Sequence, residues 1–421
     1  MSVEEFAVTQ GPLPTPPAER APVPSSESPW TLRVALLALV PLLLLAVVMA
    51  LIFATDGGVG ERNAPPIETL SVQGIRLPEP GMIELEVVND GPDEITIVQV
   101  FVDDAFWQFS QSPSGTLGRL ERATISIPYP WVEDEAHAIG LVSSTGVVFD
   151  AEVAVAIESP QTDARSFVRF GLIGLYVGIV PVALGLLWYP FMRRLGRHGF
   201  NFVLALTIGL LIFLVIDMFG AANEVALTAP ASLDAPVLVP ALALLTAAFL
   251  TTVTLALRHR DRQRGSEDSG VTTAYQIAFG IGLHNLGEGL AIGAAFALGE
   301  AALGVFLIAG FTLHNVTEGI GIAAPMVRKR PALWHFVALA AVAGGPAILG
   351  TWIGAFTYSP FWTAVFLAIG VGAILQVIYE VGRMIVRGQS KHGEPVLAWS
   401  TFGGVTAGVA IMYVTALLVA A

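Results

Sequence analysis

The chain has 421 residues, of which 54% are hydrophobic and only 13% are charged, and its formal net charge is −13. This composition excludes an ordinary soluble protein of that length and indicates several membrane-spanning segments. The chain has no cysteine, which excludes disulfides and thiolate metal sites, so any metal is expected to bind through nitrogen and oxygen. Between Asp56 and Arg165, 19 Asp and Glu stand against 5 Arg. This acidic segment has a net charge of −14 and so accounts for the whole negative charge of the chain.

The N-terminal residues 1–32 are rich in Pro, Ser, Glu and Ala and lack the apolar content that folding requires. We expect a disordered tail there. Arg33 to Ala54 follows as one apolar run, longer than the core of a secretory signal and without a small-residue cleavage site before Asp56. This run predicts an uncleaved transmembrane anchor, and a cleaved leader is the alternative.

Residues 57–162 change to short alternating segments that end at turn residues. Met82 to Val88 stops at Asn-Asp-Gly-Pro, and Glu94 to Val102 stops at Asp-Asp. About seven such strands in roughly 100 residues predict a small all-β domain, an immunoglobulin-like sandwich. A copper-binding barrel is disfavoured because the segment has one histidine, His137, and no Cys or clustered Met. The acidic group Glu133 to Glu135 beside His137 is either a cation-attracting surface or a solvated face.

Eight further apolar stretches in residues 167–421 predict eight more transmembrane helices. They run from Phe167 to Tyr189, Asn201 to Gly220, Pro236 to Leu257, Thr272 to Leu298, Ala301 to Met326, Trp334 to Phe356, Phe361 to Val386 and Leu397 to Ala420. Basic residues occur in alternate connecting loops, near Arg193, Arg260, Lys329 and Lys391. Because basic loops stay in the cytoplasm, the N-terminal tail is expected inside, with the β domain and the C-terminus outside.

The pattern Leu-His-Asn-x-x-Glu-Gly occurs twice, at Leu283–Gly289 and at Leu313–Gly319. On a helix, His and Glu four residues apart lie on the same face, so two such helices facing each other provide a four-ligand metal site. Ionisable groups in a bilayer are costly and mark ion pathways. One such histidine would usually be a helix contact, but two copies in the same order point to metal binding. The four candidate ligands are His284, Glu288, His314 and Glu318.

Two neutral imidazoles and two carboxylates suit Zn(II), Fe(II) or Mn(II) without selecting among them. The same helices are rich in glycine, which predicts close helix packing that brings the two ligand faces together. These glycines are Gly280, Gly282, Gly289, Gly293, Gly310, Gly319 and Gly321.

With these motifs and this topology, the last 255 or so residues resemble the ZIP (Zrt/Irt-like) family of divalent-metal transporters, particularly its prokaryotic members. The resemblance implies an eight-helix bundle with both ends outside and His-Asn-x-x-Glu-Gly motifs on the fourth and fifth helices, where the two copies lie here. It also implies that Asn285 and Asn315 form a second metal position sharing Glu288 and Glu318. The anchor and the β domain are additions to the family pattern.

This sequence departs from the family pattern at three positions. Many relatives have proline two residues after the Asn, whereas this chain has Gly287 and Thr317. Glycine still permits a local distortion of the helix, and threonine favours one less. On the sixth helix of the bundle, Ala347 occupies the position at which relatives often have a carboxylate. The second metal position is therefore in doubt.

Three further acidic residues lie on or just beyond predicted membrane segments: Asp217 on the second helix of the bundle, Glu224 shortly after its predicted end, and Glu380 on the seventh. They are either ligands along the pathway or interhelical hydrogen-bond partners.

We therefore expect a non-enzymatic transporter that moves a divalent transition metal, zinc first and iron or manganese as alternatives, into the cytoplasm across the plasma membrane. A metal-sensing receptor is one alternative. A membrane-embedded metal hydrolase is another, disfavoured because His-Glu-x-x-His is absent and four ligands leave no open position. The expected partners are the metal and the lipid bilayer, with a homodimer implied by the resemblance and no nucleic acid.

Overall fold

The computed structural model describes residues 32–55, 65–153, 155–263, 270–298, 301–357, 359–391, 393, 395 and 398–420. The chain divides into two compact units, Met1–Pro65 and Pro66–Ala421. Nearly all of the predicted tail, residues 1–31, and the loop residues 264–269 lie outside the described residues.

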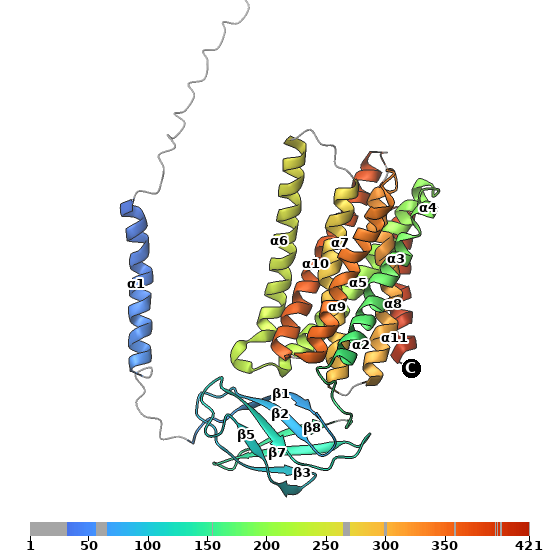
Figure 1. Ribbon diagram of the computed structural model, residues 1–421. Coiled ribbons are helices and arrows are strands. Elements are labelled where there is room, and N and C mark those ends of the chain that lie inside the picture. Colours follow the sequence, from blue (N-terminus) through green and yellow to red (C-terminus); the bar gives the residue numbers. More distant parts are fainter. Residues whose placement is uncertain are drawn as a thin grey trace, which may run out of the picture. The chain divides into compact units, whose positions relative to one another are not determined.

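The described part of the first unit is mainly the helix α1 (Leu32–Ala54), which includes Pro41 (Figure 1). Its side chains are exposed at every position where they are described. The helix has 23 residues, and its segment Leu39–Ala54 is apolar. Its function as an anchor stays a prediction.

The second unit begins with an all-β domain of two antiparallel four-stranded sheets. The first sheet has the order β1-β2-β6-β5 and the second β4-β3-β7-β8. This is the strand arrangement of an immunoglobulin-like sandwich with one extra edge strand, so the predicted all-β fold is confirmed. Alternate residues of the strands form the core, among them Leu85, Ile125 and Leu141. The strands are β1 (Leu70–Arg76), β2 (Ile83–Asn89), β3 (Ile97–Val102), β4 (Ala105–Trp107), β5 (Ser110–Ser112), β6 (Arg122–Ile127), β7 (His137–Ser143) and β8 (Val148–Val153).

The His137 side chain points into the β domain, where it is 3% exposed. Its Nδ1 lies 2.8 Å from a carboxylate oxygen of Asp103, which also accepts a hydrogen bond from the Tyr129 hydroxyl at 2.8 Å. Burial of the Asp103 carboxyl opposes its ionisation, but the hydrogen bonds from His137 and Tyr129 hold its pKa below the usual value. The hydrogen bond to Asp103 raises the pKa of Tyr129 to about 12. Since residues 133–135 are exposed and His137 is turned inward, these groups do not share a cation site.

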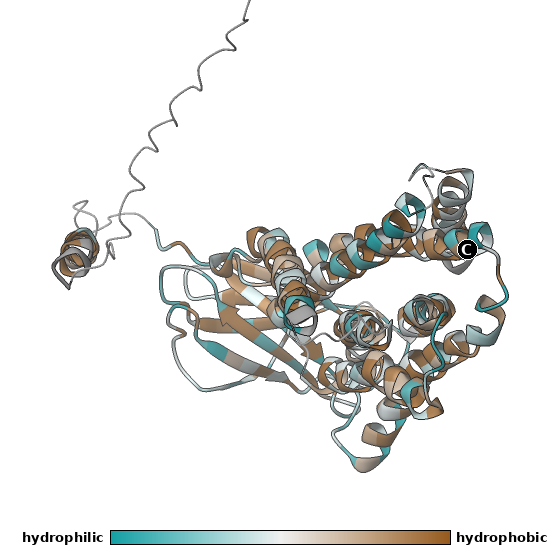
Figure 2. Ribbon diagram, turned by 90° about the horizontal axis from the view of Figure 1, so that it is seen from above, coloured by the Kyte–Doolittle hydropathy of each residue, from teal (hydrophilic) through white to brown (hydrophobic). Residues whose placement is uncertain are grey.

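The rest of the second unit is a bundle of long helices (Figure 1). Its segments are α2 (Ala164–Gly174), the π-helix η2 (Leu175–Ile179), α3 (Val180–Leu186), α4 (Tyr189–Met192), α5 (Arg197–Thr228), the short helix η3 (Ala231–Leu233), α6 (Ala235–Gln263), α7 (Gly270–Ala297), α8 (Ala301–Ala323), η4 (Ala324–Met326), α9 (Leu333–Phe356), α10 (Pro360–Ser390) and α11 (Trp399–Ala420). Hydrophobic residues predominate on these helices when the chain is viewed from above (Figure 2).

In the described part of the chain, seven helical segments are long and apolar enough to cross a membrane. They are 164–192, 197–228, 231–260, 303–326, 333–356, 360–390 and 399–417. The predicted segment from Thr272 to Leu298 corresponds to α7, which is not among the seven although it has 28 residues. Of the 28 residues of α7, 17 are buried. A helix surrounded by other helices does not need the apolar surface that contact with lipid demands.

Glycines allow α7 and α9 to pack backbone against backbone. A Cβ atom on Gly289 would lie 2.2 Å from the carbonyl oxygen of Ala347, and one on Gly350 would lie 2.2 Å from that of Leu286. Real side chains do not tolerate such contacts, so the helices approach closely only because Cβ atoms are absent. The close helix packing predicted from the glycine-rich sequence is therefore present, but Gly289 packs α7 against α9 and Gly319 packs α8 against α3, so these glycines do not pack the two motif helices against each other as predicted.

Candidate metal site

The two His-x-x-x-Glu pairs lie in the middle of continuous helices, one on α7 and one on α8. Neither motif breaks its helix. On α8 the Thr317 hydroxyl donates a hydrogen bond to the His314 carbonyl oxygen at 2.6 Å within the helix. The four predicted ligands are almost completely buried: His284 is 1% exposed, Glu288 2%, His314 3% and Glu318 1%.

Glu288 lies between the two imidazoles. Its Oε1 is 2.5 Å from Nε2 of His314 and 2.8 Å from Nε2 of His284. Each of these three side chains has a ligand atom within 4.8 Å of those of the other two. The fourth predicted ligand lies further out, with Oε1 of Glu318 at 3.7 Å from Nε2 of His284. The fold thus brings together residues from two helices whose motifs are 30 positions apart.

Several polar atoms of this cluster are buried without a hydrogen-bond partner among the described residues. They include both carboxylate oxygens of Glu318 and Nε2 of His284, whose contact with Glu288 lacks hydrogen-bond geometry. An unpaired carboxylate is costly to bury in a low-dielectric interior. A divalent cation between these groups would compensate the charge and use the free lone pairs, so the residues present fit a metal ion.

Both asparagines of the motifs use their amide nitrogen to hold neighbouring helices. Nδ2 of Asn285 donates to the carbonyl oxygen of Ala343 at 3.0 Å. Nδ2 of Asn315 donates to the carbonyl oxygen of Val177 at 3.0 Å and to Oε2 of Glu288 at 3.1 Å. In each asparagine Oδ1 is buried and lacks a partner within the described residues. A second metal position would have to use these oxygens, and it stays a prediction.

Met218 of α5, which no sequence motif indicates, also lies beside the cluster. Its sulfur lies 3.3 Å from Nδ1 of His284. The side chain passes between α7 and α10, because a Cβ on Gly287 would be 2.7 Å from the Met218 methyl group and one on Gly370 would be 2.9 Å from it. A single methionine in an apolar helix has no distinguishing pattern. The lack of cysteine excludes thiolate ligands but not this thioether, a soft and polarisable donor.

A cavity of about 310 Å³ leads to the cluster. His284 and Glu288 lie at one part of its wall and Asp217 and Glu224 of α5 at another. These two acidic residues are seven positions apart, two helical turns, and therefore lie on one face of α5. The cavity extends to Leu298, just beyond the end of α7. Two of the three predicted pathway residues thus lie along the approach to the cluster.

The third predicted pathway residue, Glu380 of α10, lies in a different environment. Its carboxylate is 1% exposed and accepts a hydrogen bond from Arg258 of α6 at 2.6 Å. Arg383 lies 3.4 Å from the other carboxylate oxygen. Glu380 therefore joins α6 to α10 as an interhelical ion pair, which was the second of its two interpretations, and it does not line the cavity that leads to the cluster.

The long apolar helices define a multi-pass membrane protein, and its buried imidazoles and carboxylates at the end of a cavity form a candidate cation site. Residues 251–416 match the family model described as ZIP Zinc transporter. This segment contains both motifs, and through it the chain is similar to the ZIP family, whose proteins are transporters and not enzymes. The resemblance inferred from the motifs is confirmed. A comparison with curated proteins gives no match.

Proposed function

We propose that this protein carries a divalent transition metal, with zinc as the first candidate and iron or manganese as alternatives, across the plasma membrane into the cytoplasm. The observation that carries the proposal is the buried cluster of His284, Glu288 and His314, beside which both oxygens of Glu318 accept no hydrogen bond from the described residues. The match to a transporter family, the chemistry of the candidate ligands and the cavity that leads to them all support a translocated cation. The metal is the substrate of the protein.

The cavity supports a stepwise approach of the cation to the cluster. Glu224 and Asp217 offer carboxylates on the way, and the cluster then offers two imidazoles and one or two carboxylates. Conduction requires sites that attract the ion without retaining it. Nitrogen and oxygen donors, with the thioether of Met218 at the edge, bind a divalent ion less tightly than a four-thiolate site would.

Uptake into proteoliposomes tests the proposal. Zn(II), Fe(II), Mn(II) and Cd(II) are offered in parallel to the purified full-length protein, with protein-free vesicles as the control. We expect uptake of at least one of these metals. Metal binding at the cluster without transport of any metal at any pH would favour a sensor or receptor.

We expect one tightly bound metal ion per chain. Ala347 provides no carboxylate for a second position, and the amide groups of Asn285 and Asn315 already hold neighbouring helices through Ala343 and Val177. Titration calorimetry of the purified protein, or anomalous scattering from crystals, would count the bound ions. Two equally tight positions per chain would contradict this prediction.

The absence of cysteine allows a direct test of the proposed orientation. We expect Ser144→Cys, in an exposed turn of the β domain, to react with a membrane-impermeant maleimide on intact cells. Arg330→Cys, in the basic loop between α8 and α9, should react only after the membrane is permeabilised, because basic loops stay in the cytoplasm. The cysteine-free parent is the control. The opposite labelling pattern would reverse the proposed direction of transport.

A further inference from the structure

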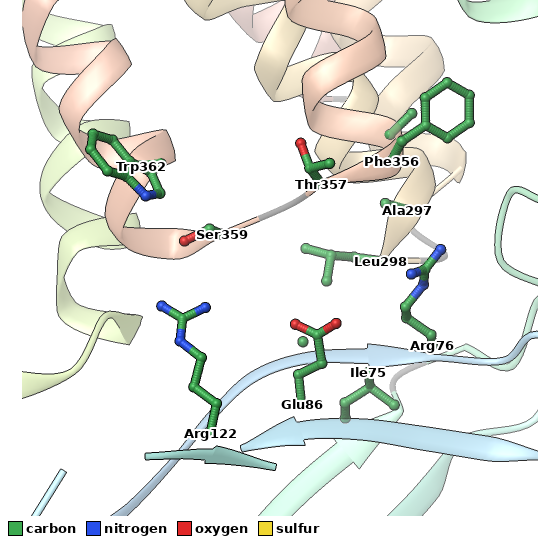
Figure 3. Close-up of a pocket in the computed structure, with 12 residues that line it drawn as sticks. Ile75, Arg76, Glu86, Arg122, Ala297, Leu298, Phe356, Thr357, Ser359 and Trp362 are labelled. Atoms are coloured by element: carbon green, nitrogen blue, oxygen red, sulfur yellow. The ribbon is translucent and has the colours of Figure 1, made fainter. Parts of the chain in front are cut away.

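Three charged side chains form a row on the polar face of the first β sheet. Arg76 comes from β1, Glu86 from β2 and Arg122 from β6, which are neighbours in the sheet. In the sheet, Glu86 lies directly opposite Gly74 of β1 and Thr124 of β6. Arg76 and Arg122 are each two residues from those partners, so they are the diagonal neighbours of Glu86 on its two sides. All three point away from the sheet toward the ends of the bundle helices (Figure 3). In the described part of the chain, none of the three makes a hydrogen bond or an ion pair with another residue.

These side chains line one wall of a cavity of about 370 Å³, and the ends of the bundle helices line the opposite wall. The β domain also contacts this end of the bundle elsewhere: Asp90 accepts hydrogen bonds from the backbone of Ala231 and Ser232 in the connection between α5 and α6. The helix-side wall is mainly apolar with two hydroxyls. It consists of Ala297, Leu298, Ala355, Phe356, Thr357, Ser359 and Trp362.

The position of the cavity indicates the kind of molecule that it takes. The helix-side wall lies where α7 and α9 end and α10 begins, which is the level at which membrane-crossing helices leave the hydrocarbon. Trp362 there is 55% exposed, as is typical of aromatic residues at a membrane interface. A molecule in this cavity therefore meets apolar helix ends on one side and charged groups on the other. A phospholipid at the surface of the bilayer has this combination.

We propose that the cavity binds the headgroup of an ethanolamine phospholipid, with the phosphate on an arginine and the primary ammonium on Glu86. Guanidinium groups bind phosphate through charge-assisted hydrogen bonds. Glu86, between the two arginines, disfavours a ligand that is only anionic and provides an acceptor for an ammonium group. A choline headgroup carries the same charges but has no N–H to donate to Glu86, so the site distinguishes the two. The inference does not depend on the proposed metal transport.

Native mass spectrometry of the full-length protein in detergent tests the proposal, with phosphatidylethanolamine and phosphatidylcholine of the same acyl chains added at equal concentration. We expect one ethanolamine lipid to be retained per chain, with a preference of about tenfold, the size expected for one hydrogen bond to a charged group. Glu86→Gln should remove the preference between the two lipids. Arg122→Gln should weaken the binding of both.

Matched controls come from the same domain. Glu152→Gln and Arg119→Gln remove the same charges at exposed positions outside the cavity and should leave lipid binding unchanged. Glu86 and Arg122 are themselves exposed, so their substitutions are not expected to unfold the domain, and a thermal unfolding curve checks this. Competition by soluble phosphoethanolamine as strong as that by the lipid would show that the ligand is a free phosphate compound. An equal response of Glu86→Gln and Glu152→Gln would overturn the proposal.

Discussion

Replacement of His284, Glu288 or His314 by alanine is expected to abolish high-affinity zinc binding and metal uptake. Each change removes one ligand from a buried cluster in which Glu288 lies within 2.8 Å of both imidazoles, and no other donor of equal strength lies in place of the lost one. Removal of a residue that only hydrogen-bonds a metal ligand lowers metal affinity about 10- to 100-fold, and the loss here should be larger. Calorimetry and uptake into proteoliposomes measure the two effects.

His198→Ala is the matched control, because His198 is exposed at the start of α5. It should bind and move metal like the parent chain. If the three cluster variants also behaved like the parent, the assignment of the metal site would be wrong.

Glu318 permits a test that separates a ligand from a structural residue. Its two carboxylate oxygens are buried and accept no hydrogen bond from the described residues, so Glu318→Gln should raise the unfolding temperature of the metal-free protein. The same change should reduce the increase in unfolding temperature that added zinc produces, because a ligand is lost. A structural role alone would lower the stability in both conditions.

Substitution of Gly289 by leucine is expected to have the second-largest effect. A Cβ there would lie 2.2 Å from the Ala347 carbonyl oxygen, a backbone atom of α9 that cannot move alone. The two helices would have to separate, and overpacking of this kind costs about 1–3 kcal/mol or more. Because Gly289 directly follows Glu288, separation of the helices also displaces the cluster. We expect a lower unfolding temperature and a loss of zinc affinity.

Gly310→Leu on α8 provides the comparison, because a Cβ at Gly310 meets no atom within 4 Å. The same residue change in an equally apolar helix should then be tolerated. Equal losses in both variants would show that helix propensity or insertion, and not the contact between α7 and α9, explains the effect of Gly289→Leu.

The sequence alone determined the features that depend on local geometry. His and Glu four residues apart share a helix face whatever the helix packs against, so both pairs could be recognised in the sequence. Strand alternation between turn residues likewise predicted the β sandwich, because the side chains of a strand alternate between its two faces. The apolar stretches predicted the helices of the bundle for the same local reason.

Tertiary packing decided which of these groups meet. Nothing in the sequence near Met218 indicates that its sulfur reaches His284, since that contact depends on the space left by Gly287 and Gly370 on two other helices. Glu380 had two equal interpretations until the fold placed Arg258 of α6 beside it. Both outcomes depend on distances between segments far apart in the chain. Local periodicity contains no information on those distances, because they depend on which helices can approach closely, and here that depends on pairs of glycines facing backbone atoms.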